Sequence, residues 1–152
     1  MKKRSILLAL VMTFELILSP AQAEPIALAN GQIEGSQSGS IRVFKGIPYA
    51  APPVGPLRWR PPQPPKPWSG VRQATAFSPA CPQLGRYPPD APAQSTSEDC
   101  LTLNIWAPAG RDISKLPVMV WIHGGAFFMG SGSSPMYDGV SLVERGDVVL
   151  VT

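Results

Sequence analysis

The pattern of hydrophobic and polar residues predicts one long buried strand near the C-terminal end of the chain. Residues 118–122 (Val-Met-Val-Trp-Ile) form an uninterrupted apolar run, which is typical of a strand covered on both faces in a parallel sheet. His123 and two glycines follow, and glycines release the backbone from strand geometry. We therefore expect a central strand ending in a turn at the carboxyl edge of the sheet, where open α/β sheets bind their ligands.

Shorter patterns predict the other elements. Asn30-Gly31 lies between two short alternating segments and indicates a hairpin, and residues 40–45 alternate like a half-buried strand. We expect residues 24–45 to form one small antiparallel unit. Further along, the pattern predicts a strand at 101–106, a short helix at 140–145 and a strand beginning at 147.

The middle of the chain is rich in proline. Fourteen of the 19 prolines lie between Pro48 and Pro92, and this density excludes both a helix and a central strand there. A flexible linker or docking peptide is one interpretation. Interleaved apolar side chains favour instead an irregular connector packed on the domain: Tyr49, Leu57, Trp59 and Trp68.

The first 23 residues have the pattern of a secretory signal peptide. Three basic residues open the chain, residues 6–14 are apolar, and Ala21-Gln22-Ala23 is a small-x-small cleavage site. The apolar run is too short to span a membrane and Glu15 interrupts it, which disfavours an uncleaved anchor. We expect cleavage after Ala23, with residues 24–152 secreted or periplasmic and without a stable membrane anchor.

Charge and cysteine content narrow the possible partners. The net charge of +3 falls to +1 without residues 1–23, because ten basic and nine acidic residues remain. No basic patch with interleaved aromatic residues is left, so we expect no nucleic-acid partner. Cys81 and Cys100 favour a disulfide in an exported chain. Two thiols and the single His123 do not complete a zinc site, so we expect no metal.

Two longer blocks resemble the type-B carboxylesterases, the family that includes the cholinesterases. Residues 46–70 read GIPYAAPPVGPLRWRPPQPPKPWSG, which is similar to the family's N-terminal region. Residues 98–108 match its EDCLxLNIxxP signature at every fixed position. The resemblance implies an α/β-hydrolase fold (class α/β), here incomplete: the N-terminal strands of the central sheet and a proline-rich crossing segment. We expect residues 24–152 to be the N-terminal part of that domain, truncated before the nucleophile elbow.

The resemblance also assigns roles to the turn after the apolar run. In acyl transfer, fixed N–H donors stabilise the charge that develops on the carbonyl oxygen. The family's oxyanion-hole donors map onto Gly125 and Ala126, and Gly124 allows the turn. Ala126 stands where the family more often has glycine, and its N–H remains available. Phe127 and Phe128 either line the acyl pocket or simply pack beside the strand.

The remaining chemistry of a serine esterase has no match in the chain. His123 precedes the glycines, whereas the catalytic His of an α/β-hydrolase follows the nucleophile, so we expect a structural hydrogen bond from it. No G-x-S-x-G motif is present, and the serines of residues 131–134 lie in a loop. Without the Ser, acid and His of the triad, the chain is expected to be inactive alone. Arg58 and Glu98 resemble a structural ion pair of the family, with an inconsequential surface pair as the alternative.

The resemblance implies a carboxylic ester hydrolase that needs no cofactor and acts on small-molecule esters through a serine acyl-enzyme. The segment between Cys81 and Cys100 contains no Trp of the kind that binds quaternary ammonium in cholinesterases, which favours neutral esters. The alternative within the fold is a non-catalytic binding or adhesion protein. A stand-alone secreted β-rich binding module is disfavoured, because its last apolar strand would remain unpaired.

Overall fold

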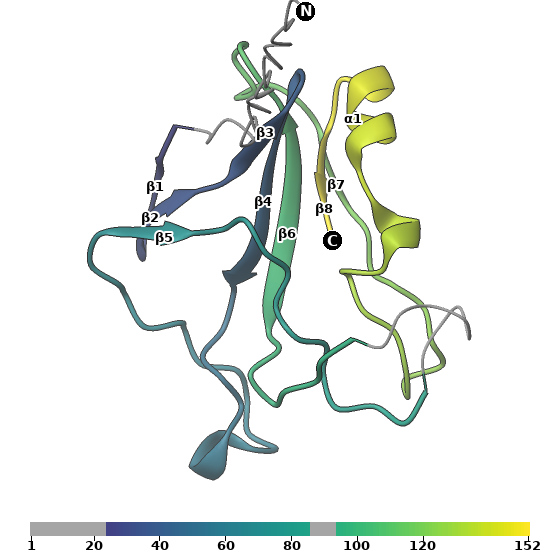
Figure 1. Ribbon diagram of the computed structural model, residues 1–152. Helices are drawn as coiled ribbons and strands as arrows, with labels where there is room; N and C mark the ends of the chain where they lie inside the picture. Colours follow the sequence, from purple (N-terminus) through teal and green to yellow (C-terminus); the bar gives the residue numbers. More distant parts are fainter. Residues whose placement is uncertain (1–23, 86–93) are drawn as a thin grey trace, which may run out of the picture.

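The computed structural model describes residues 24–85 and 94–152, so the expected signal peptide at 1–23 lies outside the described residues. Two sheets make up this part of the chain: one has the strand order β1-β2-β5, the other β3-β4-β6-β8-β7 (Figure 1). The elements are β1 (Ile26–Leu28), β2 (Gly31–Glu34), β3 (Ser36–Ser38), β4 (Ile41–Pro48), β5 (Val71–Gln73), β6 (Thr102–Pro108), β7 (Val118–Val120), α1 (Val140–Gly146) and β8 (Val149–Val151), with 3₁₀ turns at Gly55–Leu57 and Pro135–Tyr137.

The first four strands divide between the two sheets. The predicted hairpin is confirmed: β1 and β2 are antiparallel, with Leu28 opposite Gly31. The expectation of one antiparallel unit over residues 24–45 is wrong, because β3 and β4 belong to the other sheet. Gly35 makes this division possible. A Cβ there would lie 2.3 Å from the carbonyl oxygen of Val43 and 2.6 Å from the ring of Phe44, so any larger residue would push the link between β2 and β3 away from β4.

The proline-rich segment is a packed connector at Trp68 but not at Trp59. The Trp68 N–H donates to the carbonyl of Asn30, and its indole Nε1 donates to the carbonyl of Gln32, both at 2.8 Å. Its ring packs against a buried cluster made of Ile33, Phe44, Ile47 and Ala74. Tyr49 and Trp59 were expected to pack as well and are instead 54% and 95% exposed. At Trp59 the chain bends in the left-handed region (φ 58°) and leaves the ring in solvent.

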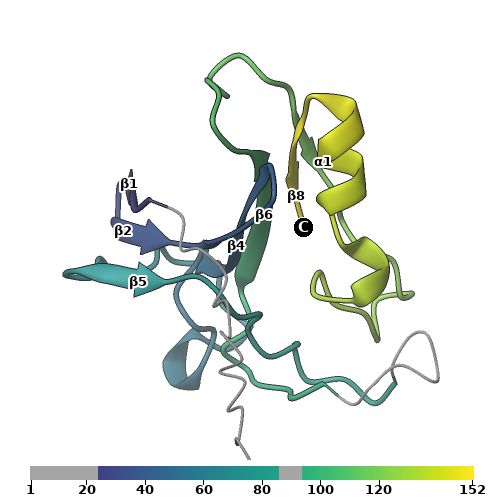
Figure 2. The same ribbon diagram turned by 45° about the horizontal axis from the view of Figure 1, so that its top comes forward.

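A second apolar cluster lies between the larger sheet and α1, which confirms the predicted helix. The helix lies beside β8 of the larger sheet (Figure 2), and its Val143 packs against Ile41, Val43, Trp106 and Leu150. The carboxylate of Asp138 accepts a hydrogen bond from the Val140 N–H at 3.0 Å and so satisfies a free donor in the first turn. In the described ranges, no helix is long and apolar enough to cross a membrane.

Asn104 is a buried polar residue in the middle of the larger sheet, only 4% exposed. Its Oδ1 accepts from the Gly46 N–H at 3.0 Å, at a bulge where the β4–β6 register shifts. Its Nδ2 donates to the Thr152 hydroxyl at 3.1 Å, and the backbones of Asn104 and Thr152 exchange two further bonds. One carboxamide therefore supplies the donor and acceptor that the bulge and the end of β8 lack.

The strand expected to be central and buried is neither. β7 pairs in parallel with β8 as expected, but it is the last strand of its sheet, and its three side chains are 45–62% exposed. The reason is positional: α1 packs over β4, β6 and β8, and β7 lies beyond the area that the helix covers. The apolar sequence correctly predicts a strand, whereas burial depends on neighbours that are not present among the described elements.

This exposed strand leads to a stability prediction. Residues 24–152 expressed alone are expected to lack a cooperative thermal transition and to bind 8-anilinonaphthalene sulfonate, because β7 and Ile122 leave a contiguous apolar surface in water. Circular dichroism melting and dye fluorescence check this. The double variant Val120→Thr, Ile122→Thr serves as the control and should bind less dye. A sharp two-state melt with well-dispersed amide resonances would contradict the prediction.

Candidate active site

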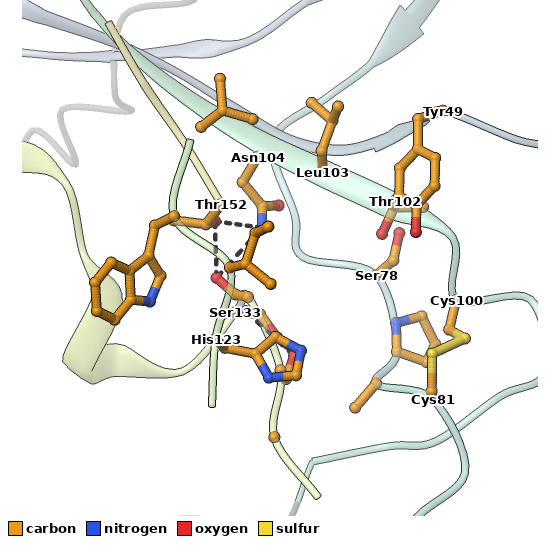
Figure 3. A pocket seen from close by; sticks show the side chains of 18 of the residues that line it. Tyr49, Ser78, Cys81, Cys100, Thr102, Leu103, Asn104, His123, Ser133 and Thr152 are labelled. Carbon is orange, nitrogen blue, oxygen red and sulfur yellow. Dashed lines mark hydrogen bonds between the residues drawn. A yellow bond between two sulfur atoms is a disulfide. The ribbon is translucent and has the colours of Figure 1, made fainter. Parts of the chain in front are cut away.

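The parallel strands β7 and β8 end together at a hollow of about 390 Å³. The location agrees with the expectation that the turn after β7 reaches the carboxyl edge of the sheet. Figure 3 shows the side chains around it, with the hydrogen bond between Asn104 and Thr152 on the sheet and the disulfide at the rim. Among the lining residues are Tyr49, Ser78, Cys81, Cys100, Asn104, His123, Ser133 and Thr152.

Residues 123–130 leave the strand in a tight reversal that we call the glycine turn. The carbonyl of Gly125 accepts from the N–H groups of Phe128 and Met129, at 3.1 and 3.2 Å. Gly125 has φ +133°, and a Cβ there would lie 1.8 Å from the carbonyl oxygen of Met129. Glycine at this position is therefore required by the turn itself and not only by space for a substrate.

The N–H groups at the start of the turn are free and their directions are fixed. Among the described residues, no acceptor pairs with the N–H groups of residues 124–127. The His123 Nδ1 donates to the carbonyl oxygen of Gly124 at 2.8 Å. Because the peptide group is planar and trans, fixing the Gly124 carbonyl also fixes the Gly125 N–H, which points the opposite way. His123 thus has the structural hydrogen bond that the sequence predicts.

The same geometry orients the second expected donor. The two hydrogen bonds to the Gly125 carbonyl fix the next peptide plane and with it the N–H of Ala126. Ala126 and Phe127 both adopt the left-handed region, with φ 53° and 65°. For residues with a Cβ this conformation costs roughly 1–2 kcal/mol each, so the hydrogen bonds of the turn must hold it in place. Both expected donors are therefore unpaired and preorganised.

A second hollow of about 460 Å³ lies between the turn and the segment that begins at Cys81. It is bordered by residues 81–83, by the turn itself and by Phe127 and Phe128. Phe127 is fully exposed and Phe128 is more than half exposed, so neither ring is packed beside the strand. Both rings border the hollow without enclosing it, and their role in substrate binding stays a prediction.

The loop serines do not form a nucleophilic site within the described residues. The Ser131 and Ser133 hydroxyls lie 2.5 Å apart, and the amide of Gln94 contacts Ser133. No described histidine shares a hydrogen bond with either hydroxyl, because the ring of His123 bonds the Gly124 carbonyl. A hydroxyl without an adjacent base is a weak nucleophile, so this loop is not expected to attack an ester.

The disulfide and the ion pair attach two irregular segments, around Cys81 and around Arg58, to residues 98–100. Cys81 and Cys100 are bonded, with their Cα atoms 5.1 Å apart. The Arg58 Nε lies 2.8 Å from the Glu98 Oε1, and both side chains are about half exposed. A pair this exposed contributes at most about 1 kcal/mol, so the covalent link is the main constraint on the segment.

Charged groups play little part in the candidate site. In the portion that the structure describes, no cluster of His, Cys, Asp or Glu could hold a metal ion. The pKa of Asp112 is lowered by hydrogen bonds from the backbone N–H and the hydroxyl of Ser114, but this turn connects β6 to β7 and borders neither hollow. The site is built from oriented backbone donors.

Sequence reasoning missed two side chains that shape the site, Gln83 and Asn104. Gln83 bonds both backbone groups of Gly130: Oε1 accepts from its N–H at 2.8 Å, and Nε2 donates to its carbonyl at 3.0 Å. Nothing in the sequence marks Gln83, since both contacts cross 47 positions. Asn104 had a usable signal, because it shares the inward face of a strand with Trp106 and an inward amide needs partners.

Comparison with known proteins identifies relatives across nearly the whole described chain. The model of the carboxylesterase family matches residues 22–152. A fumonisin B1 esterase from Sphingopyxis macrogoltabida is 50% identical over 80% of this chain and 22% of its own length. A para-nitrobenzyl esterase from Bacillus subtilis (strain 168) is 47% identical, over 80% of this chain and 25% of its own.

Solved structures give the same result for the fold. A carboxylesterase from Geobacillus stearothermophilus is 50% identical, with a TM-score of 0.74 over 84% of this chain and 25% of its own. The described part therefore has an incomplete α/β-hydrolase fold, as the sequence predicts. The chain spans about a quarter of the length of the relatives it matches. With a family match over residues 22–152 and the same arrangement of strands, the chain belongs to the carboxylesterase family.

Proposed function

We propose that the protein to which this chain contributes hydrolyses carboxylic esters through a serine acyl-enzyme, with residues 124–126 supplying the oxyanion hole. The observation that carries this proposal is the pair of unpaired, oriented N–H groups on Gly125 and Ala126. The relatives support it, since those compared above are named as esterases.

The turn would act in the step where charge develops. A serine hydroxyl, activated by a histidine base, attacks the ester carbonyl, and the carbonyl oxygen becomes an oxyanion. Donors that already point at that oxygen stabilise it without reorganisation. This chain contains no G-x-S-x-G motif, and it aligns with only about a quarter of the length of its relatives. The proposal therefore places the Ser, the acid and the catalytic His outside residues 1–152.

Small neutral carboxylic esters are the proposed substrates. The relatives are named for para-nitrobenzyl and fumonisin B1 esters, neither of which is a choline ester. Residues 82–99 contain no Trp that could bind a quaternary ammonium group. The two hollows beside the turn are lined by backbone groups and by apolar and uncharged polar side chains, with no Asp, Glu, Lys or Arg among them, which suits an uncharged ester.

Export with cleavage after Ala23 is part of the proposal. The first 23 residues have the composition of a signal peptide, and disulfides such as Cys81–Cys100 persist in oxidising compartments.

The activity is tested on the product of the complete coding frame that contains this chain. We expect hydrolysis of para-nitrophenyl butyrate with a pre-steady-state burst of nitrophenol, and stoichiometric labelling of one serine by an organophosphorus ester. Absorbance kinetics and peptide mass spectrometry measure the two. A folded product with neither turnover nor labelling would contradict the proposal and favour the non-catalytic binding protein.

The contribution of the turn is tested by Gly125→Ala in the same product. Its Cβ cannot coexist with the Met129 carbonyl, so the donors must move, and kcat should fall about 100- to 1,000-fold. Gly39→Ala is the matched control. Gly39 also has a positive φ (57°), but a Cβ there meets no atom within 4 Å and it lies in the β3–β4 hairpin. Equal losses in the two variants would show a general folding defect instead.

The export proposal predicts the N-terminus of the mature protein. When the complete frame is expressed with its own leader, the protein outside the cytoplasm should begin at Glu24, because Ala21 and Ala23 are the small residues that a signal peptidase requires. Intact-mass and N-terminal peptide analysis measure this. The variant Ala23→Tyr should accumulate with the leader attached, and a product that retains residues 1–23 in the unaltered protein would contradict the prediction.

A further inference from the structure

The segment after Cys81 holds the glycine turn through one side chain. The carboxamide of Gln83 uses both of its ends on a single residue: its Oε1 accepts from the Gly130 N–H and its Nε2 donates to the Gly130 carbonyl, at 2.8 and 3.0 Å. Two antiparallel hydrogen bonds to one residue fix its orientation as well as its position. The half-buried Gln83 therefore acts on Gly130 as a neighbouring strand would.

Gly130 in turn is in contact with the first residues of the turn. A Cβ on Gly130 would lie 2.5 Å from both the Gly124 carbonyl oxygen and the His123 Nδ1, so its Cα already packs against them. These are the two atoms whose hydrogen bond fixes the Gly124–Gly125 peptide plane. If Gly130 moved inward, the carbonyl or the imidazole would have to move, and the Gly125 N–H would turn with them.

Gln83 is itself well anchored. Its Nε2 also donates to the carbonyl of Cys81 at 3.1 Å, and Cys81 is bonded to Cys100. A second contact lies two residues later, where a Cβ on Gly85 would lie 2.9 Å from the Met129 Cε. Residues 81–85 are thus docked along the returning arm of the turn at two points.

We propose that Gln83 is a positioning residue for ester hydrolysis, which holds Gly130 so that the Gly125 N–H stays aimed at the developing oxyanion. The inference rests on the proposed esterase function. Gln83 borders the hollow beside the turn, but its carboxamide is used up by Gly130 and Cys81, so it acts through the backbone and not on the substrate. Its effect belongs to the transition state, because a donor adds most where charge has developed.

Three variants of the complete coding frame separate this role from general stability. Gln83→Leu keeps the approximate size of the side chain and removes its two hydrogen bonds to Gly130 and the one to the Cys81 carbonyl. Gln83→Glu keeps the acceptor for the Gly130 N–H and serves if the Leu variant does not fold. Gln63→Leu is the matched control: the Gln63 Nε2 also bonds a carbonyl two residues earlier, that of Pro61, at the same 3.1 Å, but Gln63 does not contact the turn.

For Gln83→Leu we expect kcat on para-nitrophenyl butyrate to fall about 10- to 100-fold, while KM changes less than about threefold. Affinity for an aliphatic trifluoromethyl ketone, which forms a tetrahedral adduct, should fall in parallel with kcat. Gln63→Leu should match the parent in both. A Gln83 variant with the kcat of the parent, or one that loses kcat/KM only through KM, would overturn the proposal.

Hydrogen exchange gives a readout that needs no activity. In Gln83→Leu, amide exchange at the hydrogen-bonded N–H groups of Phe128, Met129 and Gly130 should rise about tenfold, since the Gly130 N–H loses its acceptor and the turn loosens, and Gln63→Leu should leave it unchanged. An inactive parent would refute the esterase function alone, and exchange would still test the hold on Gly130. Unchanged exchange in Gln83→Leu would refute that hold, whatever the activity of the parent.

Discussion

The buried carboxamide of Asn104 is the interaction on which the larger sheet depends. It lies between β4 and the end of β8 and satisfies a backbone donor at the β4 bulge and a hydroxyl at Thr152. The Thr152 hydroxyl in turn donates a hydrogen bond to the carbonyl of Gly132 at 2.9 Å. A buried amide with both ends paired specifies one register, because any slip would leave polar groups unpaired away from water. The floor of the first hollow is set by this network.

The glycine turn depends on a second constraint, the planarity of the peptide group. Its free donors are not held directly. The carbonyls of Gly124 and Gly125 are held, by His123 and by the N–H groups of Phe128 and Met129, and the N–H groups on the other side of each plane follow. This arrangement leaves the donors unpaired, as an oxyanion hole requires, without leaving them free to move. The hydrogen bonds of Gln83 likewise fix the backbone of Gly130, at the end of the turn, to the segment that follows Cys81.

The exposure of β7 is consistent with the family membership of the chain, because the chain matches only part of the length of its relatives. This chain spans about a quarter of the length of the relatives it matches, and the strand that its composition marks as buried lies at the open edge of the described sheet. Apolar side chains on both faces are typical of a strand with a layer on each side. The order β3-β4-β6-β8-β7 gives β7 one neighbour only. The sequence of β7 is thus adapted to more contacts than the described residues make.

Sequence alone determined the local elements and the family. The hairpin at Asn30-Gly31 and the helix predicted at 140–145 depend on residues close together in the sequence, so they could be predicted without knowing their tertiary contacts. Residues 46–70 and 98–108, which resemble the carboxylesterases, were enough to predict the fold and the position of the turn. Tertiary structure decided what depends on distant contacts: the division of the first strands between two sheets, the exposure of Trp59 and β7, and the hydrogen bonds between Gln83 and Gly130. Burial and long-range hydrogen bonds are properties of pairs of segments, and a pattern within one segment carries no information about its partner.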